Sequence, residues 1–77
     1  MITVLFFAHL QDQVGKDKIE LEAGTITVAE LKLKLMNDFN FSSLDQVMFA
    51  INEEYAENDD LIKQGDTVAL IPPVSGG

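Results

Sequence analysis

The sequence predicts an α+β fold, in which a mixed sheet of four or five strands carries one main helix packed on one face. Its 77 residues allow a single domain. Hydrophobic residues make up 47% of the chain, so it should fold around a core rather than remain a disordered acidic tail. The apolar pattern gives the order strand, strand, helix, strand, short strand, strand. A single sheet covered by one helix accommodates that order in so short a chain.

The first part of the chain predicts two strands joined by a helical turn. Residues 2–8 are rich in β-branched and aromatic side chains and too few for a stable helix, which indicates a buried strand. Residues 9–14 fit one helical turn that Gly15 ends. Residues 18–22 alternate polar and apolar with a period of two, which is typical of a strand with one wet face. We expect the two strands to be antiparallel neighbours.

The main helix is predicted to begin at Thr27. Thr27 and Glu30 have the spacing of a capping box, in which each side chain accepts a hydrogen bond from the backbone amide of the other. Residues 37–40 end the helix. The side chains expected to face the sheet recur at helical spacing, and they are Val28, Leu31, Leu35 and Phe39.

The second half of the chain predicts the remaining strands. A third strand covers residues 47–52, and turn residues then lead to a short edge strand at residues 55–56. Asn58 is expected to cap a single helical turn that runs through residue 62. A turn at residues 64–66 precedes the last strand, residues 67–71.

The ubiquitin-like β-grasp is the compact fold that fits this order of elements. Residues 1–71 form the β-grasp domain, and residues 72–77 form an extended C-terminal tail ending in Gly-Gly. The helix covers one face, but several strands are apolar on both faces, so the other face should keep an apolar patch. Such a patch marks a protein partner, although loops or a homodimer are alternative covers. The candidates for this docking surface are Leu5, Phe7, Met48, Ala69 and Ile71.

The charge balance and residue usage exclude several classes of partner and site. Thirteen acidic residues against five lysines give a net charge of -8, which supplies no basic footprint for nucleic acid and disfavours an anionic membrane. There is no cysteine and His9 is the only histidine, so we expect no metal site and no catalytic triad. The chain opens without a basic leader or a long apolar segment, which predicts a cytoplasmic protein.

The tail carries the most distinctive pattern in the chain. Its two prolines fix φ and favour a stiff, extended exit from the last strand. The four residues after them span roughly 13 Å when extended, long enough to enter a partner's active-site channel. The glycines have no side chains, so the terminal carboxylate can approach an enclosing surface closely. The tail residues are Pro72, Pro73, Val74, Ser75, Gly76 and Gly77.

The Gly77 carboxylate is the reactive group that this composition leaves. A carboxylate is ionised at neutral pH and is a poor electrophile, so it must be activated, for example by adenylation, before a sulfur or nitrogen nucleophile takes the acyl group. The chain would then be a substrate and carrier that binds no cofactor itself, while partner enzymes supply the catalytic residues and the nucleotide site. The alternative is a frayed Gly-Gly terminus with no task.

Two stretches carry a resemblance to a known family. They are residues 50–54, Ala-Ile-Asn-Glu-Glu, and residues 65–77, Gly-Asp-Thr-Val-Ala-Leu-Ile-Pro-Pro-Val-Ser-Gly-Gly. In these stretches, in length and in element order, the sequence resembles the small sulfur-carrier subunit of molybdopterin synthase. Residues 9–15 depart from the family, which often has an Arg-Glu pair there.

The resemblance implies a β-grasp fold and a role as the non-catalytic subunit of a sulfurtransferase complex. An ATP-dependent enzyme would adenylate Gly77, and a persulfide sulfur donor would convert it to a thiocarboxylate. The tail would then enter the large catalytic subunit and give its sulfur to the cyclic pyranopterin precursor of the molybdenum cofactor. In the family, two small and two large subunits form a heterotetramer.

Three alternatives remain open from the sequence. A sulfur carrier for the thiazole of thiamine shares the fold and the Gly-Gly end, but should lack the Pro-Pro-Val stretch at residues 72–74. A ubiquitin-like modifier would stay attached to lysines of target proteins. A plain interaction module would leave the tail idle.

Overall fold

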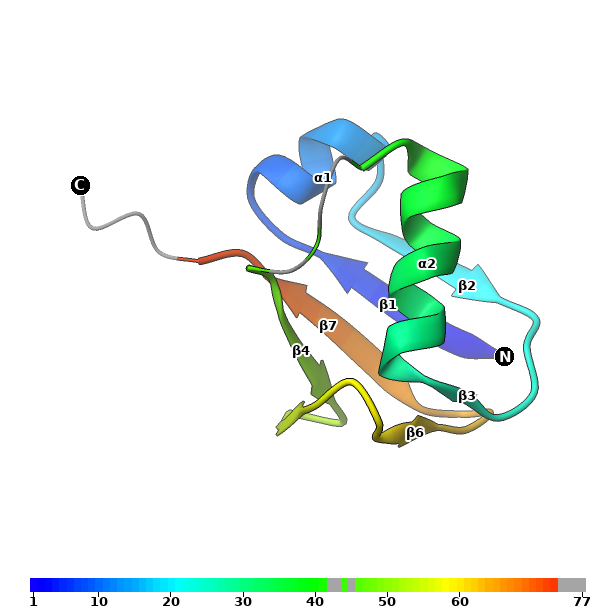
Figure 1. The fold of residues 1–77 in the computed structure, drawn as a ribbon. Coiled ribbons are helices and arrows are strands. Elements are labelled where there is room, and N and C mark those ends of the chain that lie inside the picture. Colours follow the sequence, from blue (N-terminus) through cyan, green and yellow to red (C-terminus); the bar gives the residue numbers. More distant parts are fainter. Residues whose placement is uncertain (42–43, 45, 74–77) are drawn as a thin grey trace.

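The chain forms a mixed sheet of five strands with one main helix packed on one face, as the sequence predicts. The computed structural model describes residues 1–41, 44 and 46–73. The strand order across the sheet is β2-β1-β7-β4-β5, and α2 crosses one face of it (Figure 1). This is the predicted β-grasp arrangement. The bounds of these elements are β1 Ile2–Phe6, β2 Lys18–Leu21, α2 Val28–Phe39, β4 Met48–Ile51, β5 Glu54–Ala56 and β7 Thr67–Ile71.

Strand pairing makes the sheet mixed and places the first strand, β1, beside the last strand, β7. β1 pairs antiparallel with β2, as predicted, and parallel with β7. β4 pairs antiparallel with both β7 and β5. β1 and β7 run in the same direction, so their C-terminal ends lie next to each other. The tail therefore begins beside the C-terminal end of β1.

The connection after β1 is the predicted helical turn. Helix α1 covers His9–Val14, and Gly15 ends it with φ 83°, a left-handed conformation that glycine adopts without strain. Leu10 is buried in the core. β1 is shorter than predicted because Ala8 has φ 54°, which breaks the extended backbone before α1 starts.

Helix α2 begins with the predicted capping box. The Thr27 Oγ1 accepts from the Glu30 amide at 3.1 Å, and the Glu30 carboxylate accepts from the Thr27 amide at 2.8 Å. Asn40, with φ 57°, ends the helix. Three of the four predicted core residues are fully buried, whereas Phe39 is partly buried and packs edge-on against Phe6, with ring centroids 6.0 Å apart.

The segment between β5 and β7 differs from the prediction of a helical turn through residue 62. It contains strand β6, Leu61–Ile62, which pairs antiparallel with β3, Ile26–Thr27, and neither strand was predicted. A turn at residues 57–60 comes first, closed by a bond from the Asp60 amide to the Glu57 carbonyl at 3.0 Å. The helical turn was wrong because Ile62 is fully buried, and an extended backbone brings it to the core beside the start of α2.

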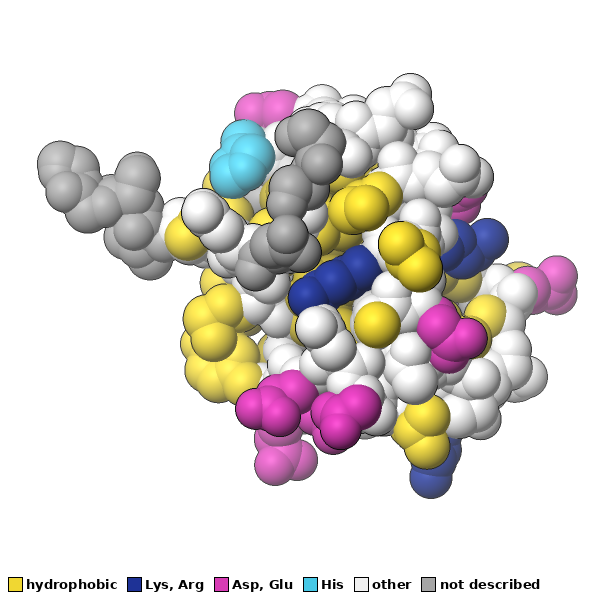
Figure 2. Space-filling view, viewed as in Figure 1, with side chains coloured by type: hydrophobic (Ala, Val, Ile, Leu, Met, Phe, Trp, Pro, Cys, Tyr) yellow, Lys and Arg dark blue, Asp and Glu magenta, His cyan; other side chains and the backbone are white. Residues whose placement is uncertain are grey.

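A lysine on α2 joins the helix to that turn. The Lys32 ammonium donates to Asn58 Oδ1 at 2.6 Å and lies 5.4 Å from the centre of the Phe49 ring. Acidic side chains gather near this point, over the segment between β5 and β6 (Figure 2).

Among the described residues, no helix is long and apolar enough to cross a membrane.

Candidate functional site

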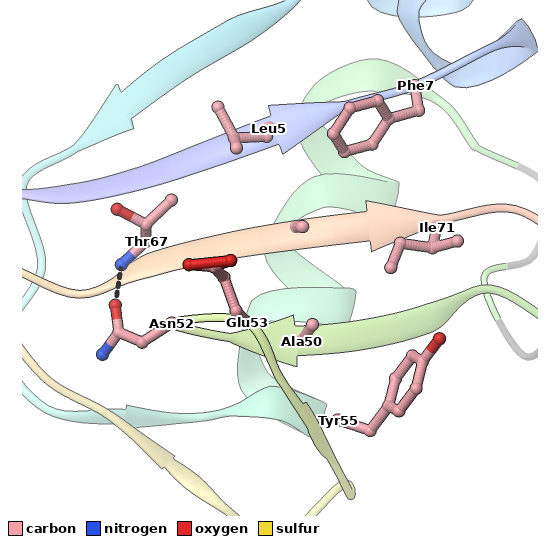
Figure 3. Close-up of a pocket in the computed structure, with 9 residues that line it drawn as sticks. Leu5, Phe7, Ala50, Asn52, Glu53, Tyr55, Thr67 and Ile71 are labelled. Atoms are coloured by element: carbon pink, nitrogen blue, oxygen red, sulfur yellow. Dashed lines mark hydrogen bonds between the residues drawn. The ribbon is translucent and has the colours of Figure 1, made fainter.

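The face of the sheet away from α2 contains an open apolar hollow. Its volume is about 790 Å³. Figure 3 looks onto this face and shows the lining side chains on β1, β7, β4 and β5, with α2 behind the sheet. The residues that line the hollow are Leu5, Phe7, Ala50, Asn52, Glu53, Tyr55, Thr67, Ala69 and Ile71.

One row of side chains across four strands shapes the hollow. Strand register pairs Leu5 with Ala69, Ala69 with Ala50, and Ala50 with Tyr55. Paired residues point to the same face, so the row reads large, small, small, large. Ala50 is only 5% exposed although α2 lies on the opposite face, because its taller neighbours rise around it. Tyr55 is 69% exposed and forms the outer wall.

The structure brings together most of the predicted docking residues. Both Leu5 and Phe7 line the hollow, and so do Ala69 and Ile71. Met48 does not line it, but pairs with Ile71 and is 49% exposed at its border. Ala50 and Tyr55 line the hollow but were not predicted. Ala50 could have been predicted, because it lies two residues after Met48 and so on the same face of the strand. The position of Tyr55 beside Ala50 depends on the β4–β5 register, which the sequence does not give.

A tight hairpin turn builds the polar end of the hollow. Asn52 and Glu53 join β4 to β5 with φ values of 50° and 71°, the pair of positive angles that defines a type I′ turn. The Asn52 side chain accepts from the Thr67 amide at 3.0 Å, as the dashed line in Figure 3 shows. Its amide nitrogen donates to Asp66 Oδ1 at 3.0 Å. Asn52 therefore ties the hairpin to the start of β7.

A second turn, at residues 63–66, completes this corner. Gly65 has φ 90°, which only glycine adopts readily. The Asp66 carboxylate accepts from the Lys63 amide at 2.9 Å. That hydrogen bond, and then the one from Asn52, lowers the pKa of Asp66 below its ordinary value of 3.8. The Gly-Asp-Thr and Asn-Glu stretches quoted for the family resemblance therefore meet in one hydrogen-bonded corner.

The tail begins at the apolar end of the hollow. Ile71 lines the hollow and is the last residue of β7, and Pro72 and Pro73 follow directly. Pro73 is exposed. The predicted site residues Val74, Ser75, Gly76 and Gly77 lie outside the described residues.

The described residues that line the hollow offer a surface for contact. His9 is exposed at the start of α1. Within residues 1–41, 44 and 46–73, no group of three or more His, Asp or Glu side chains is placed to hold a metal ion. What this arrangement can do is present an apolar face beside the start of the Gly-Gly tail.

Comparisons with known proteins agree with the sequence resemblance. The ThiS family model matches residues 4–77. The molybdopterin synthase sulfur carrier subunit of Drosophila melanogaster is 38% identical, over 99% of this chain and 90% of the relative. The subunit of the same name from Escherichia coli K12 is 35% identical over the whole of both chains.

Solved structures share the fold. SAMP1 from Haloferax volcanii has a TM-score of 0.82 at 26% identity, over 99% of this chain and 98% of that one. In the complex of subunits 1 and 2 of the molybdopterin-converting factor from Helicobacter pylori, a chain matches with a TM-score of 0.70 at 24% identity, over 99% and 97% of the two chains. From the family match and these relatives, the chain belongs to the ThiS family and is similar to the sulfur carrier subunits of molybdopterin synthase.

Proposed function

We propose that this chain is a sulfur carrier in the biosynthesis of the molybdenum cofactor. The observation that most supports this proposal is the position of the hollow. It ends at Ile71, where the tail with its Pro-Pro and Gly-Gly residues starts. A partner that binds the hollow is therefore within reach of the tail. The names of the relatives that cover nearly the whole chain, molybdopterin synthase sulfur carrier subunits, support this role.

The Gly77 carboxylate is the group that carries sulfur in this proposal. A separate enzyme adenylates it with ATP and releases pyrophosphate. The terminal sulfur of a persulfide donor then displaces AMP to form an acyl disulfide. A thiol reduces this bond with two electrons, which leaves the thiocarboxylate on Gly77 and a disulfide on the donor side.

The second part of the proposal concerns the place where sulfur is used. The hollow docks on the large catalytic subunit, and the tail enters the active site, where the thiocarboxylate sulfur attacks the cyclic pyranopterin precursor. Two small and two large subunits make up the complex. The precursor carries phosphate, and a chain with net charge -8 is poorly suited to bind it, so substrate binding belongs to the large subunit.

The test is the intact mass of the chain after incubation with ATP, the activating enzyme and a persulfide donor. We expect a gain equal to the replacement of one oxygen by sulfur. Deletion of Gly77 should abolish the gain, whereas Lys34→Ala, a change on the exposed side of α2, should leave it intact. An unmodified full-length chain under conditions that modify a known sulfur carrier would contradict the proposal.

A protein modifier is the second candidate, because the likeness to a small archaeal modifier protein reaches a TM-score of 0.82 at 26% identity. Stable conjugates of high mass in cell extracts that disappear when Gly77 is deleted would favour it.

A carrier for thiamine thiazole is distinguished by growth. A strain that lacks this chain should lose molybdoenzyme activity and still grow without thiamine.

A further inference from the structure

The hollow has the shape of a socket for a bulky apolar side chain. Three strand spacings separate the backbones of Leu5 and Tyr55, roughly 14 Å in all. Between these two walls the floor consists of Ala69 and Ala50, which add little height. Phe7 and Ile71 close one end. Phe7 at the closed end is 46% exposed and Tyr55 in the wall is 69% exposed, so both have apolar surface left to bury.

The charges at the hollow are arranged asymmetrically along the sheet. The polar end has the Glu53 carboxylate in its lining and the half-buried Asp66 bonded to Asn52 beside it. In Figure 3, the Glu53 side chain points from the hairpin across the sheet toward β7. On the opposite flank, strand register pairs Lys18 with Leu5 and Glu20 with Thr3, so one positive and one negative charge offset each other there. Glu53 and Asp66 have no such counter-charge among the described residues that line the hollow, so a cationic group is attracted more strongly to the Glu53 end.

We propose that Ala50 and Ala69 form the specificity-determining floor of this socket. The part of the hollow directly above these alanines receives one leucine- or phenylalanine-sized side chain of the large subunit, while a lysine or arginine of the same subunit pairs with Glu53. This inference rests on the proposed function and adds the chemistry of the partner surface. Both features are needed, because the apolar side chain supplies the buried contact and the charge pair sets its orientation.

A second copy of this chain fits the hollow less well. Two such faces brought together about a twofold axis would oppose walls with walls and join two chains that each carry a net charge of -8. The same charge attracts a basic partner surface. A partner with a protruding apolar group and a positive rim is therefore the complementary occupant.

The first experiment fills the socket. Ala69→Leu places a side chain over the floor, and Thr3→Leu is its matched control. Thr3 lies two residues before Leu5 on β1, so it is on the same face, and it is not among the residues that line the hollow. We expect Ala69→Leu to weaken binding to the large subunit at least about tenfold and Thr3→Leu to change it less than about threefold.

The second experiment reverses one charge without changing the floor. Glu53→Lys is compared with Glu54→Lys, its neighbour in the sequence. Glu54 pairs with Ile51, which packs on the core, so Glu54 lies on the face opposite Tyr55. We expect Glu53→Lys to weaken binding about tenfold at low salt, with the difference from Glu54→Lys shrinking as salt is added. This pair tests the socket even if Ala69→Leu does not fold.

Binding of the full chain to the purified large subunit is measured by calorimetry, and the fold of each variant by circular dichroism. Equal binding by folded Ala69→Leu and Thr3→Leu would overturn the socket, as would equal effects of the two lysine variants. The mass gain on Gly77 is measured separately, so the sulfur-carrier part of the proposed function would stand after either result. If the unaltered chain gains the sulfur but does not bind the large subunit, the inference fails together with the proposed docking, and only the sulfur-carrier part remains. If it does neither, the proposed function fails with it.

Discussion

Asn52 is the residue whose replacement tests the geometry of the site most directly. Its side chain accepts a hydrogen bond from the Thr67 amide at 3.0 Å and donates one to Asp66 at 3.0 Å. Its backbone is left-handed, with φ 50°. Asn52→Ala removes both side-chain bonds and places a less tolerant residue in that conformation. The backbone bond from the Asn52 amide to the Thr67 carbonyl at 2.8 Å remains, so the hairpin should stay paired with β7 but be held less strongly.

The expected loss in the free energy of unfolding has two contributions. The hydrogen bond from the Thr67 amide contributes about 1 kcal/mol, and alanine at a positive φ costs about 1 kcal/mol more. The bond from the Asn52 side chain to Asp66 is left out of this sum. The free energy of unfolding should therefore fall by about 2 kcal/mol. In a chain of 77 residues, such a loss lowers the Tm by roughly 8–16 °C.

Urea unfolding followed by circular dichroism measures this loss, with the slope against urea checked for constancy. Asn52→Gly is the matched control, because glycine loses the same two bonds but accepts the left-handed backbone. It should be more stable than Asn52→Ala by about 0.5–1 kcal/mol. If the two variants are equally stable, the backbone argument is refuted. If both match the unaltered chain, the hydrogen-bond argument is refuted too.

Two further predictions concern the helix cap and acid pH. Thr27→Ala removes the acceptor of the Glu30 amide and should lower the free energy of unfolding by about 1 kcal/mol in the same assay, whereas Thr27→Ser keeps the hydroxyl and should lose much less. The lowered pKa of Asp66 means that folding favours the ionised carboxylate. The contribution of Asp66 to the free energy of unfolding is therefore complete above its ordinary pKa of 3.8 and is lost as the pH falls through the lowered pKa. Asp66→Asn should thus be less stable than the unaltered chain at neutral pH, and the gap should close at the acid end of a pH series. A gap that stays constant with pH would contradict this assignment.

Local patterns predicted most of the elements because their signals lie within a few residues. The capping box at Thr27 and Glu30 was predicted from spacing alone and is formed. The strand at residues 67–71 was predicted with its observed bounds. Strands β3 and β6 were missed because each has two residues and exists only through its partner. No local pattern distinguishes such a pair from a turn.

Only some of the residues that line the hollow were predicted, because local patterns identify the face of a strand but not its partners across the sheet. Alternation along each strand identified Leu5, Phe7, Ala69 and Ile71 as candidates, and these residues share one hollow. Ala50 and Tyr55 entered the site only through cross-strand register, which joins residues far apart in the chain. The Asn52 bonds to Asp66 and Thr67 likewise need the β4–β7 pairing.

The sequence by itself determined the fold class, the capped helix and the family resemblance, because each depends on residue types at short, fixed spacings. It also supplied the Gly-Gly tail, whose proposed chemistry needs only a terminal carboxylate and residues without side chains. Tertiary structure decided the shape of the apolar face. Only the parallel pairing of β1 with β7, and the antiparallel pairing of β4 with β7 and β5, place two alanines between a leucine and a tyrosine. Register is a long-range property, so the hollow beside the tail could not be derived from any one segment.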